Sequence, residues 1–156
     1  MLWVCMHFPQ LALDVFGAPP ELPLVVEEVS RQRREVLLAS PAALAAGVRP
    51  GMNIPSAYGL CDQLQVKARD EALEQKALQR IALPSYQFTP HIALCPPDNL
   101  LLELESSLRL FGGCQALLES LQAALAEEGL QYTLACFPTA KGAMVLARCG
   151  VEFNQA

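Results

Sequence analysis

The residues best suited to chemistry stand in or beside two short apolar stretches of the chain. Cys5 and His7 alternate along the first stretch, and Asp98 and Asn99 begin the second one. A site for hard divalent cations such as Mg²⁺ needs several carboxylate oxygens, and these four residues supply a single carboxylate. A thiol and a neutral amide are poor ligands for such ions. The four residues by themselves therefore do not predict a Mg²⁺ site.

Nucleophilic and zinc chemistry are also weakly supported. A thiol nucleophile at Cys5, with His7 or His91 as its base, lacks an evident acid to orient that base. The six cysteines form no C-x-x-C pair and only two histidines are present, so the clustered ligands of a zinc site are missing. Most of the cysteines stand in apolar runs, which predicts reduced core thiols.

Structural roles are the simpler interpretation of Asp98 and His7. Aspartate favours turn and capping positions, and Asp98 follows two prolines. His7 is expected to be a partly buried strand residue. A remaining role as a metal ligand is the alternative for each.

Apolar periodicity predicts the elements that position these residues. Residues 2–8 form an apolar run, and residues 99–105 alternate leucine with glutamate, so both predict strands. Further strands are predicted at 24–29, 35–40 and 132–137. Helices are predicted just after Pro9 and at 41–46, 54–60, 68–83, 114–128 and 138–148.

The order of these elements predicts an α+β protein. An early strand separated from a later strand–helix–strand unit fits a split ferredoxin-like antiparallel sheet that carries a small mixed α/β insertion. Strands 2–8 and 99–105 are expected side by side in this sheet. Helices 114–128 and 138–148 are expected on one of its faces.

The composition is apolar and weakly acidic. Apolar residues make up 53% of the 156 residues, and the net charge is −5. Such a content supports a substantial core and excludes a disordered chain. No run of about 18 apolar residues occurs and the N-terminus lacks the basic start of a signal peptide, so no membrane contact and a cytoplasmic location are expected.

An acidic protein can contact nucleic acid through a local basic patch. Arg31, Arg33 and Arg34, in the turn between the strands 24–29 and 35–40, are the candidate phosphate contacts. The alternative is a solvated hairpin turn that discourages pairing at a sheet edge.

Three stretches of the chain carry a family resemblance. They are LWVCMHFPQLAL at the start, EVLLASPAALAAGVRPGMNIPSAYGLC with its Gly-Val-x-x-Gly-Met sequence, and SSLRLFGG after Asp98-Asn99. The chain resembles the palm and fingers of Y-family DNA polymerases, most closely their catalytically inactive ImuB branch. The resemblance implies a palm-like domain of residues 1–18 plus 84–156 and a fingers-like insertion of residues 19–83. It also implies that thumb and little-finger regions are absent from this chain.

The same resemblance implies that the binding positions of active polymerases are altered here. The metal-site positions hold Cys5, His7, Asp98 and Asn99, and the triphosphate contacts fall on Leu38, Pro41 and Leu44. None of these three can donate a side-chain hydrogen bond to a phosphate. The resemblance therefore implies a protein that is not an enzyme and lacks the Mg²⁺ cofactor of active relatives.

Such a protein is implied to be a scaffold or adaptor in the translesion synthesis of the bacterial SOS response to DNA damage. Its implied partners are a sliding clamp, a RecA-like accessory protein and an error-prone polymerase subunit, and DNA contact is weak or made by regions beyond residue 156. One alternative is an active translesion polymerase whose metal site is displaced to Asp14, Asp98 and Glu103. Another is a stand-alone interaction domain unrelated to DNA.

Overall fold

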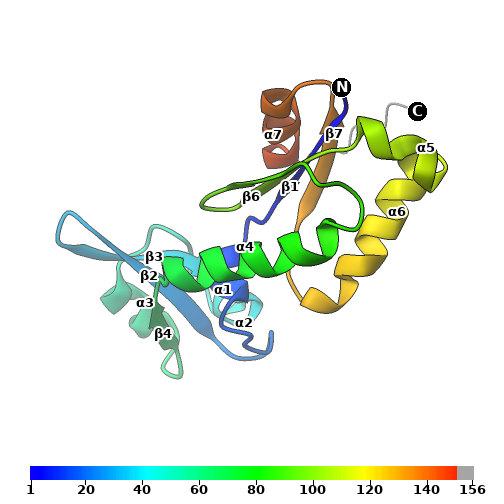
Figure 1. Ribbon diagram of the computed structural model, residues 1–156. Helices are drawn as coiled ribbons and strands as arrows, with labels where there is room; N and C mark the ends of the chain where they lie inside the picture. Colours follow the sequence, from blue (N-terminus) through cyan, green and yellow to red (C-terminus); the bar gives the residue numbers. More distant parts are fainter. Residues whose placement is uncertain (151–156) are drawn as a thin grey trace. The chain divides into compact units, whose positions relative to one another are not determined.

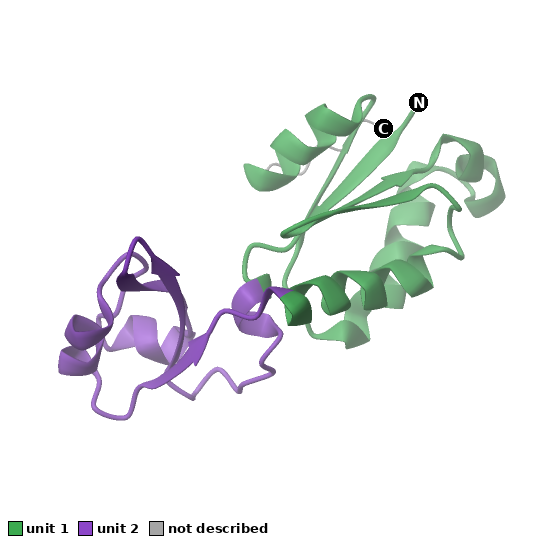
Figure 2. Ribbon diagram, turned by 60° about the vertical axis from the view of Figure 1, so that its left-hand side comes forward, with its two compact units in different colours: residues 1–11, 72–156 green, residues 12–71 purple. Residues whose placement is uncertain are grey.

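The computed structural model describes residues 1–150, which divide into two compact units (Figure 2). Unit 1 comprises residues 1–11 and the described residues from 72 onward, and unit 2 comprises residues 12–71. The family resemblance implied an insertion of residues 19–83, whereas this division counts nearly all of helix α4 (Glu71–Ser85) in unit 1. Over the described residues, no helix is both long and apolar enough to cross a membrane.

Unit 1 is built on a four-stranded antiparallel sheet (Figure 1). Its strands lie in the order β5 (Ile92–Cys95), β6 (Asn99–Glu103), β1 (Trp3–His7) and β7 (Thr133–Phe137). In the β1–β6 pair, Trp3 lies opposite Glu103 and His7 lies opposite Asn99. The predicted pairing of residues 2–8 with 99–105 is therefore confirmed.

Helices cover both faces of this sheet, so the prediction that helices 114–128 and 138–148 share one face is wrong. Helix α7 (Ala140–Arg148) packs on Cys5 and Ala135. Helices α4 and α6 (Cys114–Leu125) lie on the opposite side (Figures 1 and 2). The physical reason lies in β1, where Val4, Cys5 and Met6 are all fully buried. Successive strand residues point to opposite faces, so this strand needs apolar cover on both.

The remaining segments of unit 1 refine the expected boundaries. Strand β6 ends at Glu103 and a 3₁₀ turn η1 (Glu105–Ser107) and helix α5 (Leu108–Phe111) follow. Helix α6 ends in a second 3₁₀ turn, η2 (Ala126–Glu128). Helix α4 continues one residue past Pro84, where the sequence had predicted its end, and the Ser85 hydroxyl donates to the Ile81 carbonyl at 2.9 Å. Strand β5 was not predicted.

The turn between β7 and α7 fixes the position of that helix. Thr139 is its N-cap, and the Thr139 hydroxyl accepts a hydrogen bond from the Gly142 amide at 3.2 Å. The Phe137 ring lies so close to Gly142 that a Cβ atom there would overlap it. A side-chain-free position is therefore required in the first turn of α7.

Unit 2 is a small mixed α/β unit. Strands β2 (Leu24–Ser30) and β3 (Arg33–Ala39) form the predicted hairpin, and β4 (Gln65–Ala68), which was not predicted, pairs with β2 in parallel. The helices are α1 (Leu11–Asp14), which begins at the unit boundary, α2 (Pro41–Ala45) and α3 (Ile54–Leu60). The core of the unit joins both strands of the hairpin to α2 and α3 through Val25, Val36, Ala43, Val48, Ile54 and Ala57.

Candidate functional site

The four residues at the metal-site positions lie together at one end of the β1–β6 pair. His7 lies directly opposite Asn99 in the register. Cys5 lies two residues before His7, on the same face of β1. Asp98 immediately precedes β6, where its carbonyl accepts a hydrogen bond from the Phe8 amide at 2.8 Å. The two strands thus bring together residues that are more than 90 positions apart in sequence.

Asn99 is the centre of a hydrogen-bond network among these residues. It is fully buried. Its Oδ1 lies 3.1 Å from His7 Nδ1 and 3.7 Å from Cys5 Sγ. Its Nδ2 donates to Asp98 Oδ1 at 3.1 Å. An amide oxygen only accepts, so in this arrangement His7 Nδ1 carries a proton, and Asn99 accepts from two neighbours and donates to the third.

The network satisfies its own polar atoms. No buried side-chain nitrogen or oxygen in the described part of the chain lacks a hydrogen-bond partner. His7 Nδ1 also lies 3.8 Å from Asp98 Oδ2, and the two side chains are 13% and 28% exposed. An amide buried without partners would cost about 1–3 kcal/mol. The network therefore stabilises this end of the sheet, and its buried oxygen atoms already have hydrogen-bond partners within the protein.

Cys5 is held in its protonated form. Burial is the main cause that raises the pKa of its thiol to about 12; the neighbouring Cys95 and Asp98 act in the same direction, while Arg148 opposes them. At neutral pH the group is therefore a thiol, which can donate to Asn99. The thiolate is the form that attacks electrophiles and binds metals, so the structure does not favour either of those roles at Cys5.

Sequence reasoning missed Cys95 and Arg148 as neighbours of this site. Cys95 pairs with Asn99 in the β5–β6 register, and burial raises the pKa of its thiol. Arg148 is the last residue of α7, and its positive charge acts on the Cys5 thiol. No strand was predicted over β5, and the expectation that helices 114–128 and 138–148 share a face did not place the end of 138–148 near Cys5. Nothing in the local sequence therefore pointed to either residue.

This donor set does not fit Mg²⁺. Magnesium demands oxygen ligands in near-octahedral geometry, and Asp98 is the one carboxylate in the network. The amide oxygen of Asn99 already accepts two hydrogen bonds. Throughout residues 1–150, no three His, Cys, Asp or Glu side chains converge to hold a metal ion.

The displaced metal site gains no support either. Asp14 belongs to unit 2. Glu103 ends the strand that Asn99 begins, and its carboxylate accepts a hydrogen bond from the Glu105 amide at 2.9 Å. The side-chain hydrogen bonds of Asn99 go to Cys5, His7 and Asp98, and Glu103 is not among these partners.

The three positions expected to contact a triphosphate are apolar residues of unit 2. Leu38 lies in β3, Pro41 begins α2, and Leu44 stands in the last turn of that helix, 38% exposed. The polar group among them is the buried Ser40, the N-cap of α2. Its hydroxyl accepts from the amides of Leu24 and Ala43 and donates to the Leu22 carbonyl, at 2.8–3.3 Å. The three hydrogen bonds of this hydroxyl are all made within unit 2, where they cap α2 and join it to the segment at Leu22–Leu24.

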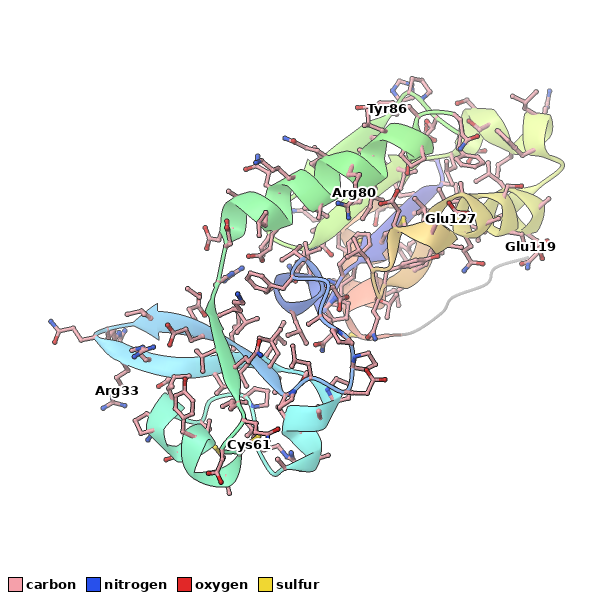
Figure 3. All side chains as sticks on the ribbon, turned by 90° about the horizontal axis from the view of Figure 1, so that it is seen from below. Arg33, Cys61, Arg80, Tyr86, Glu119 and Glu127 are labelled. Carbon is pink, nitrogen blue, oxygen red and sulfur yellow. The ribbon has the colours of Figure 1, made fainter. Side chains whose placement is uncertain are left out.

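The three arginines proposed as phosphate contacts at the hairpin turn have different surroundings. Arg34 is paired, because its Nε and Nη2 lie 2.8 and 2.7 Å from Glu27 Oε2. Arg31 and Arg33 are exposed at the tip, and the Arg33 side chain extends away from the hairpin (Figure 3). Arg31 and Gln32 both have positive φ, 49° and 64°, as a tight hairpin turn requires. The candidate patch thus narrows to Arg31 and Arg33.

Comparison with known proteins identifies a matching family and similar individual proteins. Residues 19–147 match the impB/mucB/samB family. Protein ImuB of Caulobacter vibrioides is 32% identical over 106 residues. That match covers 68% of this chain and 23% of the Caulobacter protein, so the chain spans about a quarter of its relative's length.

Solved structures share the fold. DinB from Sulfolobus solfataricus matches with a TM-score of 0.70 at 20% identity, and the match covers 96% of this chain and 46% of that one. The insertion ternary complex of Dbh DNA polymerase gives 0.73, with the same identity and coverage. At this identity the likeness concerns the fold alone. The mixed α+β architecture is that of the palm and fingers of these polymerases.

Proposed function

Because the chain belongs to the impB/mucB/samB family and has a Y-family polymerase fold, we propose that it is a non-catalytic homologue that acts as a scaffold or adaptor in DNA-damage-induced translesion synthesis. The observation that carries this proposal is the closed network around Asn99. It occupies the end of the β1–β6 pair with one carboxylate, one amide, one imidazole and one protonated thiol.

The chemistry of nucleotide addition supports this conclusion. Catalysis of phosphoryl transfer rests on positioning and on neutralising charge with metal ions. One carboxylate does not offset two dications, and a buried amide cannot replace a second carboxylate. The apolar side chains of Leu38, Pro41 and Leu44 offer the triphosphate no donor. Two independent requirements of the reaction are therefore unmet.

A scaffold acts by binding other molecules, so the proposal includes its partners. The partners that we propose are those that the family resemblance implies, namely an error-prone polymerase subunit, a sliding clamp and a RecA-like accessory protein. The net charge of −5 makes a strong general affinity for DNA unexpected from this chain. Contact with phosphates through Arg31 and Arg33 at the hairpin tip is the local exception that we propose.

A metal titration tests the proposal directly. Mg²⁺ and Mn²⁺ are titrated into the protein by calorimetry, with and without a deoxynucleoside triphosphate. We expect no saturable site tighter than about 1 mM, which corresponds to about −4 kcal/mol. Asp98→Asn is the matched control, because it removes the one carboxylate of the network and changes few atoms. A tighter site in the unmodified protein that is lost in Asp98→Asn would overturn the proposal.

A further inference from the structure

One exposed arginine of unit 2 is held at the end of α2 by backbone carbonyls. The Nη1 atom of Arg49 donates to the Leu44 carbonyl at 2.8 Å and to the Val48 carbonyl at 2.9 Å. A cation is favourable at this end of a helix, because the last carbonyls have no partners within the helix. Capping of α2 therefore accounts for one nitrogen of the guanidinium.

The other nitrogens of Arg49 are available to another molecule. A guanidinium has five N–H donors, and the two bonds to carbonyls use both hydrogens of Nη1. Within residues 1–150, no carboxylate forms an ion pair with Arg49, whose side chain is exposed. The remaining edge, between Nε and Nη2, presents two parallel N–H groups, the arrangement that binds both oxygens of a carboxylate.

The backbone around Arg49 is fixed to the sheet of unit 2. The Gly51 amide donates to the Val36 carbonyl at 2.7 Å, and the Val36 amide donates to the Met52 carbonyl at 2.8 Å. These two bonds join the loop after Arg49 to β3, and Val48, just before it, is fully buried. A partner would meet an arginine that is already ordered, which lowers the entropy cost of binding.

Exposed apolar side chains lie beside this arginine. Leu60, the last residue of α3, is 48% exposed, and Leu44 is exposed as well. A Cβ atom at Gly47 would lie 3.7 Å from Cδ1 of Leu60, and the Gly47 amide donates to the Leu44 carbonyl at 3.0 Å. The two leucines therefore flank Gly47. We call the surface formed by Leu44, Gly47, Arg49 and Leu60 the Arg49 surface.

We propose that the Arg49 surface binds a protein segment in which an aspartate or glutamate stands beside large apolar side chains. The carboxylate pairs with Nε and Nη2 of Arg49, and the apolar side chains cover Leu44 and Leu60. A peptide fits better than nucleic acid, because DNA binding draws on several cations at phosphates, whereas leucines flank Arg49. This partner chemistry rests on the proposed scaffold role, but peptide binding and metal binding are measured separately, so either proposal can fail alone.

Selection from random short peptides displayed on phage tests the chemistry of the partner. The full chain is immobilised, and the selected peptides are synthesised with a fluorescent label for anisotropy titration. We expect the selected peptides to share an acidic residue next to leucine, isoleucine or phenylalanine. Selection of peptides that lack a carboxylate, or of none above background, would overturn the proposal.

A double-mutant cycle tests the ion pair with a selected peptide. Arg49→Lys keeps the charge but loses the planar fork, so it should weaken binding about tenfold. Asparagine in place of the peptide's aspartate should cost a similar factor, and the two changes together should cost little more than one. Leu60→Ser should weaken binding, and Arg109→Met, which removes an exposed arginine of unit 1, should not. Losses that multiply in full would place the carboxylate elsewhere and overturn the proposal.

The NMR signal of the Arg49 Nε–H group gives a second measurement, made in the unmodified protein. The signal should move downfield when the acidic peptide binds and stay in place with the asparagine peptide. An unmoved signal with bound acidic peptide would contradict the pairing. A labelled DNA duplex that moves the same signal and displaces the peptide would replace the proposal with a nucleic-acid contact. Neither result depends on whether a variant folds.

Discussion

The central role of Asn99 predicts that Asn99→Asp, a change of one side-chain group, destabilises unit 1. The variant replaces the Nδ2 donor, which lies 3.1 Å from Asp98 Oδ1, with a carboxylate oxygen. It loses a hydrogen bond to a charged acceptor, worth about 1.5–3 kcal/mol, and it places a second negative charge in a fully buried position. Breaking a buried polar arrangement in this way costs about 3–5 kcal/mol. We therefore expect the free energy of unfolding to fall by about 3 kcal/mol at pH 7.

The loss in Asn99→Asp should depend on pH. Burial and the nearby Asp98 hold the pKa of the new carboxyl above its unfolded value of about 3.9. A group with a raised folded pKa causes no loss below the unfolded pKa, and its cost grows as pH rises toward the folded pKa. The variant should thus approach the parent near pH 4 and diverge by up to about 1.4 kcal/mol per pH unit.

Urea unfolding followed by the fluorescence of Trp3 measures this effect. Trp3 is the single tryptophan and lies in β1, so it reports on the sheet that holds Asn99. The matched control is the double variant Asp98→Asn with Asn99→Asp, which exchanges the amide and the carboxylate and restores one donor and one acceptor. It should recover most of the lost free energy, as a double-mutant cycle detects. An Asn99→Asp variant that unfolds at the parent's urea concentration at pH 7 would show that the network contributes nothing.

Three further outcomes are expected. Cys5→Asp with Asn99→Glu, made in a longer protein that includes DNA-binding regions, should show no nucleotide incorporation in primer extension, because the triphosphate contacts remain apolar; measurable incorporation would contradict the account of unit 2. Gly142→Ala should destabilise unit 1 by about 2 kcal/mol in urea unfolding, and Phe137→Leu in the same variant should restore part of that loss, whereas no loss would disprove the close approach. Ser40→Ala should lower the thermal stability of unit 2 by about 1–2 kcal/mol, with Ser40→Thr as the conservative control, and an unchanged melting curve would remove Ser40 from its capping role.

Local sequence signals determined a large part of the elements. Residues 54–60 form α3 with the predicted bounds, and Ser40-Pro41 begins α2 as the capping preferences require. The apolar run in 2–8 predicted a buried strand, and its pairing with the strand after Asp98 followed from the split-sheet pattern. The four metal-site positions could be named from resemblance alone, since each depends on residue identity at a place in the chain.

Tertiary structure decided the rest. Strands β4 and β5 have four residues each and exist because a neighbouring strand pairs with them, so no periodicity marks them. The distribution of α6 and α7 over two faces depends on which alternate residues of β1 each helix covers. The hydrogen bonds of Asn99 with Cys5 and His7 depend on the register between β1 and β6. Contacts between residues far apart in the chain are fixed by packing, and the local sequence does not encode where a distant side chain will point.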